Sequence, residues 1–495
     1  MTEVDRGVLK GPFRQASDLP FEEIAILPRH GIWEEHGDAV EASVRCIDDM
    51  LQGEHNATVG TCSAHRPTDP DGLVAQVRSV RRRFPKARLK GWPCDLEKAY
   101  KQVPGDARRL ALMIIVIWNP VLLEPAYFIP LCQLFGGKSP PLNFARYAGW
   151  LCEVAGTLFA LPLTHCVDDI ICVEPEELVE SGHIAFKLLC AATGWSISPS
   201  KAPPPSSMFL VIGVELSLTG TPESEAVLKS SAKRVAQLLK ILENLKRTAK
   251  LTPGMASSLT GKLGFALCAC YGRFGRAKLR PFIRRAGENR SGMNAQIQSA
   301  TEFWLSFLIS YMPRPVPMFL EDLETVVSYS DGEGAKAGVG VAVWSSRLPN
   351  GPLAAFLEVP EYIRQLWDKG GKDDYNDIFL VEAVGPLAVL ETYPNVLRNC
   401  LWVHYIDNVA AQYSLIKGSS SITCGDVVVG ETWRRIQRLG AHVYFDRVDS
   451  KANPVDGLSR GRSEGPWRQV DRARLPGDLE ERLRTSTNEE DCVME

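Results

Sequence analysis

Two adjacent acids, Asp168 and Asp169, stand between two short apolar segments of the chain. Burying like charges side by side is costly, so such a pair is typical of a turn that faces solvent or a metal ion. A tight turn between two strands would present both carboxylates to a divalent cation, and the pattern therefore predicts a β-hairpin with the two acids at its tip. The chain also contains Asp48–Asp49 and Asp373–Asp374, so a solvated turn is the alternative explanation for any one pair.

A third acid, Asp95, ends an apolar segment upstream of this hairpin and is followed five positions later by Tyr100. Three such carboxylates can hold two metal ions, and hard oxygen ligands suit Mg²⁺. We call Asp95, Asp168 and Asp169 the first acidic set.

A second acidic set consists of Asp331, Glu382, Asp407 and Asp456. The pattern places Asp331 at the end of a strand before a glycine-rich hairpin, Glu382 in an apolar helix, Asp407 at the end of a strand and Asp456 at a helix start. Four carboxylates can bind two Mg²⁺ ions. Taken singly, Asp407 can be a turn residue and Asp456 a helix N-cap.

The charge of the chain is concentrated in its middle. Net charge is only −3, yet residues 229–290 contain fifteen Lys or Arg and two acids. Apolar residues recur at three- and four-residue steps from Val235 to Leu245, which predicts an amphipathic helix with a basic outer face. Such a segment suits a phosphate backbone.

The chain contains 13 cysteines without regular spacing and 8 histidines that do not fall at zinc-ligand spacing. This composition excludes a disulfide framework, argues against a zinc site and favours an intracellular location, cytoplasmic or nuclear. The N-terminus has no apolar core for export, and the most apolar run, Leu110–Trp118, is too short to cross a bilayer. We expect that run to form a buried strand, and we expect no signal peptide, no membrane segment and no membrane partner.

Strand-like and helical patterns alternate from Leu89 to Leu216, which predicts an α+β sheet domain. A length of 495 residues allows about three domains. The predicted boundaries are 1–90, 91–225, 226–320 and 321–465, followed by a charged tail, 466–495, that we expect to be disordered.

Three motifs together resemble the palm of reverse transcriptases: Asp95-Leu96-x-x-Ala99-Tyr100, then Phe135-Gly136, then Val167-Asp168-Asp169. The second acidic set, in its element order, resembles a ribonuclease H domain. Further segments, among them Arg45-x-Ile47-Asp48-Asp49 and Asn453-Pro454-x-Asp456-Gly457, are similar to the DIRS-like, tyrosine-recombinase retrotransposon group.

The resemblance implies a right-hand polymerase: fingers within 1–90, a palm over 91–225 and a basic helical thumb or connection over 226–320. An α/β ribonuclease H-like domain follows over 321–465. Both acidic sets would be catalytic and would bind Mg²⁺, two ions per site, or alternatively Mn²⁺. The other implied roles are nucleotide binding by Arg45, Tyr100, Phe135, Gly136 and Lys201, and nucleic-acid binding by Lys246, Arg247, Lys262, Arg273 and Arg276.

The expected function is that of a retrotransposon RNA-directed DNA polymerase with ribonuclease H activity. Its partners would be an RNA or DNA template-primer, an RNA–DNA hybrid and deoxynucleoside triphosphates, and such a chain can be one part of a larger polyprotein. The alternative is a decayed or domesticated nucleic-acid-binding scaffold that keeps the folds. Leu134, where the family commonly has proline, and Cys166, where it usually has an aromatic, favour the alternative, whereas the seven acids favour the enzyme. A weaker third reading keeps only the nuclease.

Overall fold

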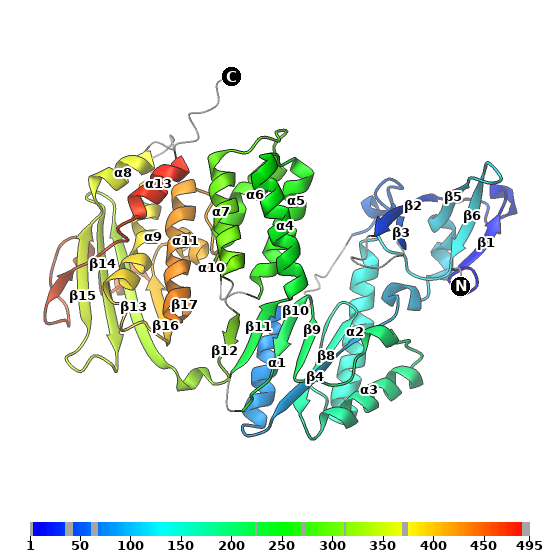
Figure 1. The fold of residues 1–495 in the computed structure, drawn as a ribbon, viewed down its shortest axis with the longest axis horizontal. Coiled ribbons are helices and arrows are strands. Elements are labelled where there is room, and N and C mark those ends of the chain that lie inside the picture. The colour runs from blue at the N-terminus through cyan, green and yellow to red at the C-terminus, as the bar shows by residue number, and fades with distance from the viewer. Residues whose placement is uncertain are drawn as a thin grey trace. The chain divides into compact units, whose positions relative to one another are not determined.

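The computed structural model describes residues 3–34, 43–60, 68–222, 225–269, 273–310, 313–368 and 375–487. The fold is mixed α+β and divides into two compact units (Figure 1). Unit 1 is Met1–Ile212 with Leu216–Ser224, and unit 2 is Gly213–Glu215 with Glu225–Glu495. No helix among these described residues is long and apolar enough to span a membrane.

Among the described residues, two sheets lie wholly within unit 1. The five-stranded sheet has the order β1 (Leu9–Phe13), β6 (Glu124–Pro130), β5 (Ile114–Asn119), β2 (Ile26–Glu34) and β3 (Ser43–Asp48). The three-stranded sheet has the order β4 (Leu89–Asp95), β8 (Asp169–Pro175) and β7 (Leu163–Cys166). Its helices are α1 (Pro70–Arg83), α2 (Ser139–Phe159) and α3 (Val179–Ala192).

Short 3₁₀ helices connect these elements: η1 (Ala16–Asp18), η2 (His55–Ala57), η3 (Ala99–Gln102), η4 (Ala107–Met113) and η5 (Pro199–Lys201). The strand predicted over Leu110–Trp118 is therefore wrong in its first half, because residues 110–113 belong to η4 and the strand begins at Ile114. The apolar run alone could not show where the strand begins, because an apolar run without a period does not separate a turn from a strand.

The sheets do not follow the predicted boundary at residue 90. β5 and β6 lie in the range assigned to the palm, yet they pair with β2 and β1 in the five-stranded sheet. The β2–β5 pairing is parallel and joins segments almost ninety residues apart, so no local pattern announces it. The three-stranded sheet instead packs with α1, α2 and α3 around a core that includes the fully buried Trp92.

The strands β9 (Met208–Val211) and β10 (Val214–Ser217) fall where the two units meet in sequence. Unit 2 then continues with β11 (Ala226–Ser230), which pairs with β12 (Arg314–Val316). Between these two strands stand α4 (Ala232–Thr248), α5 (Pro253–Leu267), η6 (Arg276–Leu279), α6 (Arg280–Ala286) and α7 (Ala295–Ile309).

The helices α4 to α7 lie side by side as a bundle around a core that includes Trp304 (Figure 1). Their starts are set by local chemistry, since Ser231, Thr252 and Asn294 each accept a hydrogen bond from a backbone N–H of the first turn. The amphipathic helix expected around Val235–Leu245 is present as α4, with Leu238 and Leu242 buried.

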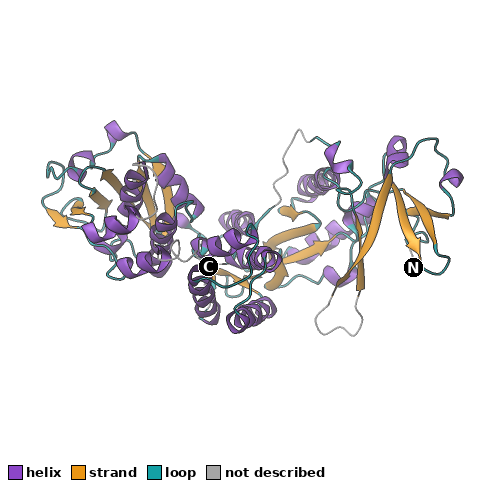
Figure 2. Ribbon diagram, turned by 90° about the horizontal axis from the view of Figure 1, so that it is seen from above, coloured by secondary structure: helices purple, strands orange, loops and turns teal. Residues whose placement is uncertain are grey.

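The rest of unit 2 is a six-stranded sheet covered by helices, best seen end-on in Figure 2. The strand order is β17 (His442–Arg447), β16 (Cys400–Ile406), β13 (Glu324–Glu333), β14 (Gly338–Ser345), β15 (Leu353–Glu358) and β18 (Val470–Arg472). The helices are α8 (Glu361–Asp368), α9 (Tyr375–Thr392), α10 (Val409–Lys417), α11 (Thr423–Leu439), α12 (Asp456–Ser459) and α13 (Leu479–Thr487), with η7 (Leu320–Asp322) and η8 (Ser450–Ala452) between elements.

The prediction of a disordered tail over 466–495 is wrong for most of that range. Residues 470–472 form β18, which pairs in parallel with β15, and α13 packs against α11, α8 and α7. Leu479 and Leu483 are fully buried on α13, and Arg482 forms ion pairs with Glu431 and Asp478. The charged side chains of the tail form ion pairs with residues on neighbouring helices. Composition alone does not distinguish such paired charges from the charges of a disordered segment.

Candidate functional site: two acidic clusters

The first acidic set is brought together by one β-register. β4 pairs antiparallel with β8 so that Asp95 lies opposite Asp169, and the backbone N–H of Leu96 donates to the carbonyl of Asp168. The β7–β8 hairpin pairs Cys166 with Asp169, which leaves Val167 and Asp168 at the tip. The hairpin prediction is therefore confirmed.

The hairpin tip is strained. Val167 has φ 56°, in the left-handed region that a β-branched side chain avoids. Such a conformation costs on the order of 1–3 kcal/mol and is typically held by its surroundings at functional sites. A glycine at this position would not be strained. The presence of a strained valine instead is consistent with a turn that serves to position Asp168.

The electrostatics of this cluster are those of crowded carboxylates. Burial and the neighbouring charges of Asp168 and Asp95 together raise the pKa of Asp169 to about 6. Burial also raises the pKa of Asp168, with Asp95 adding to the effect. Lys201 opposes this repulsion: its ammonium donates to Oδ1 of Asp95 at 3.0 Å, and that hydrogen bond raises the pKa of Lys201.

Some of the residues predicted to bind nucleotide have side chains that the structure describes, and these lie beside this cluster. The rings of Tyr100 and Phe135 are 4.7 Å apart, and Tyr100 also packs edge-on against Phe144. Burial raises the pKa of Tyr100, and the charge of Asp168 raises it further, so the ring lies near the acids. Arg45 is in β3, but its side chain lies outside the described residues.

Gly136 is fixed by two contacts that the sequence did not reveal. It has φ +95°, and a Cβ there would lie 2.3 Å from the carbonyl oxygen of Asp48, so only glycine fits. The side chain of Asn56 donates to the carbonyl of Gly136 at 2.9 Å and accepts from the N–H of Lys138 at 2.9 Å. Asn56 thereby positions the Phe135–Gly136 turn.

The second acidic set converges on the centre of the six-stranded sheet. Asp331 is in β13, Glu382 in α9 and Asp407 directly after β16, the strand that pairs in parallel with β13. One carboxylate oxygen of each lies within 4.8 Å of the other two, a spacing that would let these three acids share one metal ion and that the first acidic set and Asp456 do not reach in the described residues. Asp331 does not end its strand as predicted, because β13 continues to Glu333.

The close approach of α9 to β13 depends on a missing side chain. A Cβ on Gly332 would lie 3.0 Å from the backbone nitrogen of Glu382. That tight fit lets the N–H of Gly332 donate to the Glu382 carboxylate. Glycine next to Asp331 therefore allows the helix-borne acid to reach the strand-borne one.

Glu382 has the most perturbed pKa of this cluster. Burial raises it to about 10, and the charges of Asp407 and Asp331 contribute. Its Oε2 atom is buried without a hydrogen-bond partner. Burial also raises the pKa of Asp331 to about 6. A buried, unsatisfied carboxylate oxygen among further carboxylates fits a divalent cation, which would supply the missing positive charge.

Asp456 lies at the edge of this cluster. Its charge raises the pKa of Asp331, so it is near, but its Oδ1 atom forms an ion pair with Arg460 at 2.8 Å. It is the first residue of α12, and Val455 is the N-cap, so the simple capping explanation of Asp456 is wrong.

Two supporting groups were missed as functional residues. Asn453 donates from Nδ2 to the carbonyl of Ser330 at 3.0 Å and to Oδ1 of Asp331 at 3.3 Å. The buried imidazole of His404 bridges the hydroxyls of Ser328 and Ser330 at 2.7 and 3.0 Å. The Asn453-Pro454-x-Asp456 motif signalled the first; nothing local signalled the second, because its partners come from another strand.

The five residues predicted to bind nucleic acid occupy the bundle of unit 2. Lys246, Arg247 and Lys262 are exposed on α4 and α5. Arg273 is instead occupied in a hydrogen bond from Nε to the carbonyl of Ile416 at 3.3 Å, and Arg276 is exposed on η6. An exposed basic surface therefore exists on two helices, with Arg273 serving the contact to α10.

No protein-family model matches this sequence, and no curated protein matches it. Three solved structures of a foamy viral protease-reverse transcriptase are similar to this chain. Each is 12% identical to it in sequence and is aligned over 90% of its length. The dRH form in complex with dsDNA gives a TM-score of 0.48 over 68% of that chain. The complexes with dsDNA and with an RNA/DNA hybrid give 0.47 over 81% and 52% of those chains. With TM-scores below 0.5, this overlap carries no inference about activity.

Proposed function

We propose that the chain is an RNA-directed DNA polymerase with ribonuclease H activity, of a retrotransposon similar to the DIRS-like group. The observation that carries the proposal is the convergence of two acidic clusters from distant segments. Asp95 faces Asp169 through a β-register, and the oxygens of Asp331, Glu382 and Asp407 lie within 4.8 Å. Buried like charges are too costly to be gathered twice without a cation.

In the polymerase site, Asp95, Asp168 and Asp169 would hold Mg²⁺, which when bound lowers the pKa of an attacking 3′-hydroxyl and neutralises charge on the leaving pyrophosphate. Tyr100, packed on Phe135 and Phe144, would fill the space that a ribose 2′-hydroxyl would need, which would favour deoxynucleotides. Asn56 keeps the Phe135–Gly136 turn in position.

In the nuclease site, Asp331, Glu382, Asp407 and Asp456 would hold the metal ions, and Asn453 would orient the carboxylate of Asp331. Exposed Lys246, Arg247 and Lys262 would bind a duplex through its phosphates, with strong salt dependence and little sequence preference. The family resemblance alone supports a nucleotide-binding role for Arg45 and a nucleic-acid-binding role for Arg273 and Arg276.

Primer extension with Mg²⁺ on a homopolymer template, and cleavage of an RNA–DNA hybrid, test the two activities separately. Asp168→Asn should abolish extension and spare cleavage; Glu382→Gln should do the reverse. The matched controls are Asp71→Asn on α1 and Glu361→Gln on α8, both exposed. Salt-dependent binding of nucleic acid with neither activity in the wild type would instead establish the scaffold.

A further inference from the structure

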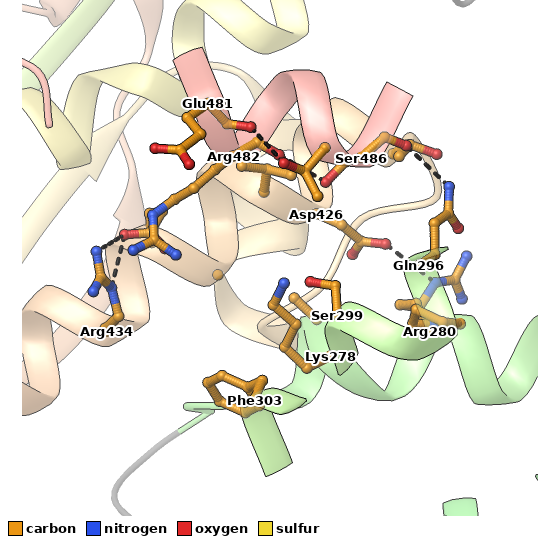
Figure 3. Close-up of a pocket in the computed structure, with 18 of the residues that line it drawn as sticks. Lys278, Arg280, Gln296, Ser299, Phe303, Asp426, Arg434, Glu481, Arg482 and Ser486 are labelled. Atoms are coloured by element: carbon orange, nitrogen blue, oxygen red, sulfur yellow. Dashed lines mark hydrogen bonds and ion pairs between the residues drawn. The ribbon is translucent and has the colours of Figure 1, made fainter. Parts of the chain in front are cut away.

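Unit 2 contains a cavity of about 320 Å³ between its bundle and its six-stranded-sheet domain. The bundle side is formed by η6, α6 and α7, and the other side by α11 and α13 (Figure 3). Both acidic sets are absent from its lining. The cavity is therefore separate from the sites described above.

Lys278 points into this cavity from η6 (Figure 3). Its backbone is held in place because the indole N–H of Trp304 donates to its carbonyl at 3.1 Å. Its ammonium makes no hydrogen bond or ion pair with any residue that the structure describes. Burial lowers the pKa of Lys278, as expected for a cation that lacks a partner.

The acids nearest to Lys278 are already engaged. Glu431 accepts hydrogen bonds from Arg434 at 2.8 Å and Arg435 at 2.7 Å, and lies 3.3 Å from Arg482. Each of these arginines also lies close to a further acid, Asp478 or Glu391. The charge of Glu431 raises the pKa of Lys278, but no hydrogen bond or ion pair joins the two side chains.

Arg280 is a second cation of the cavity, and Asp426 does not accept a hydrogen bond from it. Oδ1 of Asp426 accepts from the N–H of Ser420 at 2.7 Å, while its Oδ2 is 3.6 Å from Nε of Arg280 and 3.8 Å from Nη2 of Arg284. These two distances are too long for hydrogen bonds. Nε of Arg280 is buried and has no hydrogen-bond partner. Lys278 thus faces the cavity with an ammonium that no acceptor contacts, and Arg280 lines the cavity beside a carboxylate that is too distant to accept from its Nε.

We propose that this cavity binds a small phosphate-bearing anion between Lys278 and Arg280. A phosphate group offers several oxygens to donors that approach from different directions, and arginine and lysine are its usual partners. Asp426 faces the same space, and its carboxylate can accept a hydrogen bond from the P–OH group of a hydrogen phosphate. Glu481 also lines the cavity but is exposed to solvent.

Occupancy would have a structural consequence. Lys278 and Arg280 belong to the bundle, whereas α13 belongs to the sheet domain and already reaches α7, where Gln296 donates to the carbonyl of Ser486 at 3.0 Å. A bound anion would add to this connection. We therefore expect the ligand to raise the unfolding temperature of the full chain.

The test uses the full chain with inorganic phosphate and with pyrophosphate, at constant ionic strength held with NaCl. Calorimetric titration should show one site, and Lys278→Met should weaken it by about tenfold or more, as expected for loss of one charge-assisted contact. Without phosphate this variant should unfold at about the same temperature, because the ammonium of Lys278 makes no hydrogen bond or ion pair that its loss would break. Lys187→Met, at an exposed position of α3, is the matched control and should bind as the wild type does.

The proposal is overturned if the wild type binds neither probe up to about 10 mM, a concentration that corresponds to a negligible affinity, or if Lys278→Met binds as well as the wild type. A 5′-phosphorylated dinucleotide and its unphosphorylated form identify the source of the phosphate. Lys278-dependent binding of the phosphorylated form that exceeds that of free phosphate supports a nucleic-acid end as ligand; weaker binding supports a free anion. Neither result depends on polymerase or nuclease activity, so failure here leaves the proposed function intact.

Discussion

The two acidic clusters solve the same electrostatic problem in different ways. In unit 1, Lys201 supplies a positive charge within hydrogen-bond distance of Asp95, from a side chain that is 65% exposed. In unit 2, Glu382 is 4% exposed and keeps a buried oxygen without a partner. The first cluster can stay charged without a metal, whereas the second must bind a cation or take up a proton. The two sites should therefore differ in how strongly metal supports folding.

The largest expected effect is loss of polymerisation in Asp168→Asn. Removing one of three metal-binding carboxylates should cost about 4 kcal/mol of transition-state stabilisation, roughly a thousandfold in rate. Single-nucleotide incorporation measures it, and hybrid cleavage should be unchanged. Extension at the wild-type rate would show that the first cluster is not the catalytic site.

Glu382→Gln should reduce hybrid cleavage by about a hundredfold or more, because it removes one ligand charge. In EDTA the same variant should be more stable than the wild type, since a glutamine is neutral in both states, whereas Glu382 must take up a proton when the chain folds at neutral pH. Cleavage assays and thermal unfolding measure the two effects. A variant that is inactive and less stable in EDTA would contradict the view that the carboxylate is strained.

Metal itself should distinguish the clusters. Mn²⁺ or Mg²⁺ should raise the unfolding temperature of the wild type, and most of this gain should disappear in Glu382→Gln and persist in Asp168→Asn. The reason is that Lys201 already offsets the charge of Asp95 in unit 1. An equal loss in both variants would remove the difference between the two sites.

Lys201→Gln should have a smaller effect on stability, under about 1 kcal/mol, because the pair with Asp95 is largely solvent-exposed on the lysine side. It should, however, make unit 1 more dependent on metal, as unit 2 is. Thermal unfolding with and without Mg²⁺ checks both points. Unchanged metal dependence would mean that the lysine does not act as the local counter-ion.

A further effect, on the sheet domain of unit 2, concerns pH. Burial lowers the pKa of His404 to about 3, below the value near 6.5 of an unfolded chain, so the unfolded state binds the extra proton in between. Stability should fall as pH drops below about 6.5, by about 1–2 kcal/mol between pH 7 and pH 5. His404→Gln, which can still bond to Ser328 and Ser330, should flatten this slope in chemical unfolding. An unchanged slope would exclude His404 as its source.

Local patterns predicted the pieces of this protein well. The hairpin around Asp168 and Asp169 follows from two apolar runs with acids between them, and α4 follows from the spacing of its leucines. The helical position of Glu382 and the strand before Asp407 are likewise as predicted. These features depend on neighbours in sequence, and periodicity records such neighbours directly.

Long-range pairing was not predictable in this way. The assignment of β5 and β6 to the five-stranded sheet, and the order in α13, depend on partners far along the chain. The same holds for Asn56, whose amide is matched to the backbone around Gly136, and for the bridge of His404 between two serines of β13. The residues next to a side chain in the sequence do not indicate which distant residue it contacts in the fold.

The sequence by itself determined which acids are present, on which elements they lie and that positive charge gathers between residues 229 and 290. Only the tertiary structure decided which acids have their charge offset. Asp95 has a lysine beside it, whereas Glu382 keeps a buried oxygen without a partner. The cavity around Lys278 was likewise invisible in the sequence. The physical reason is that burial and pairing depend on which surfaces meet, and the free energy of a charge depends on both.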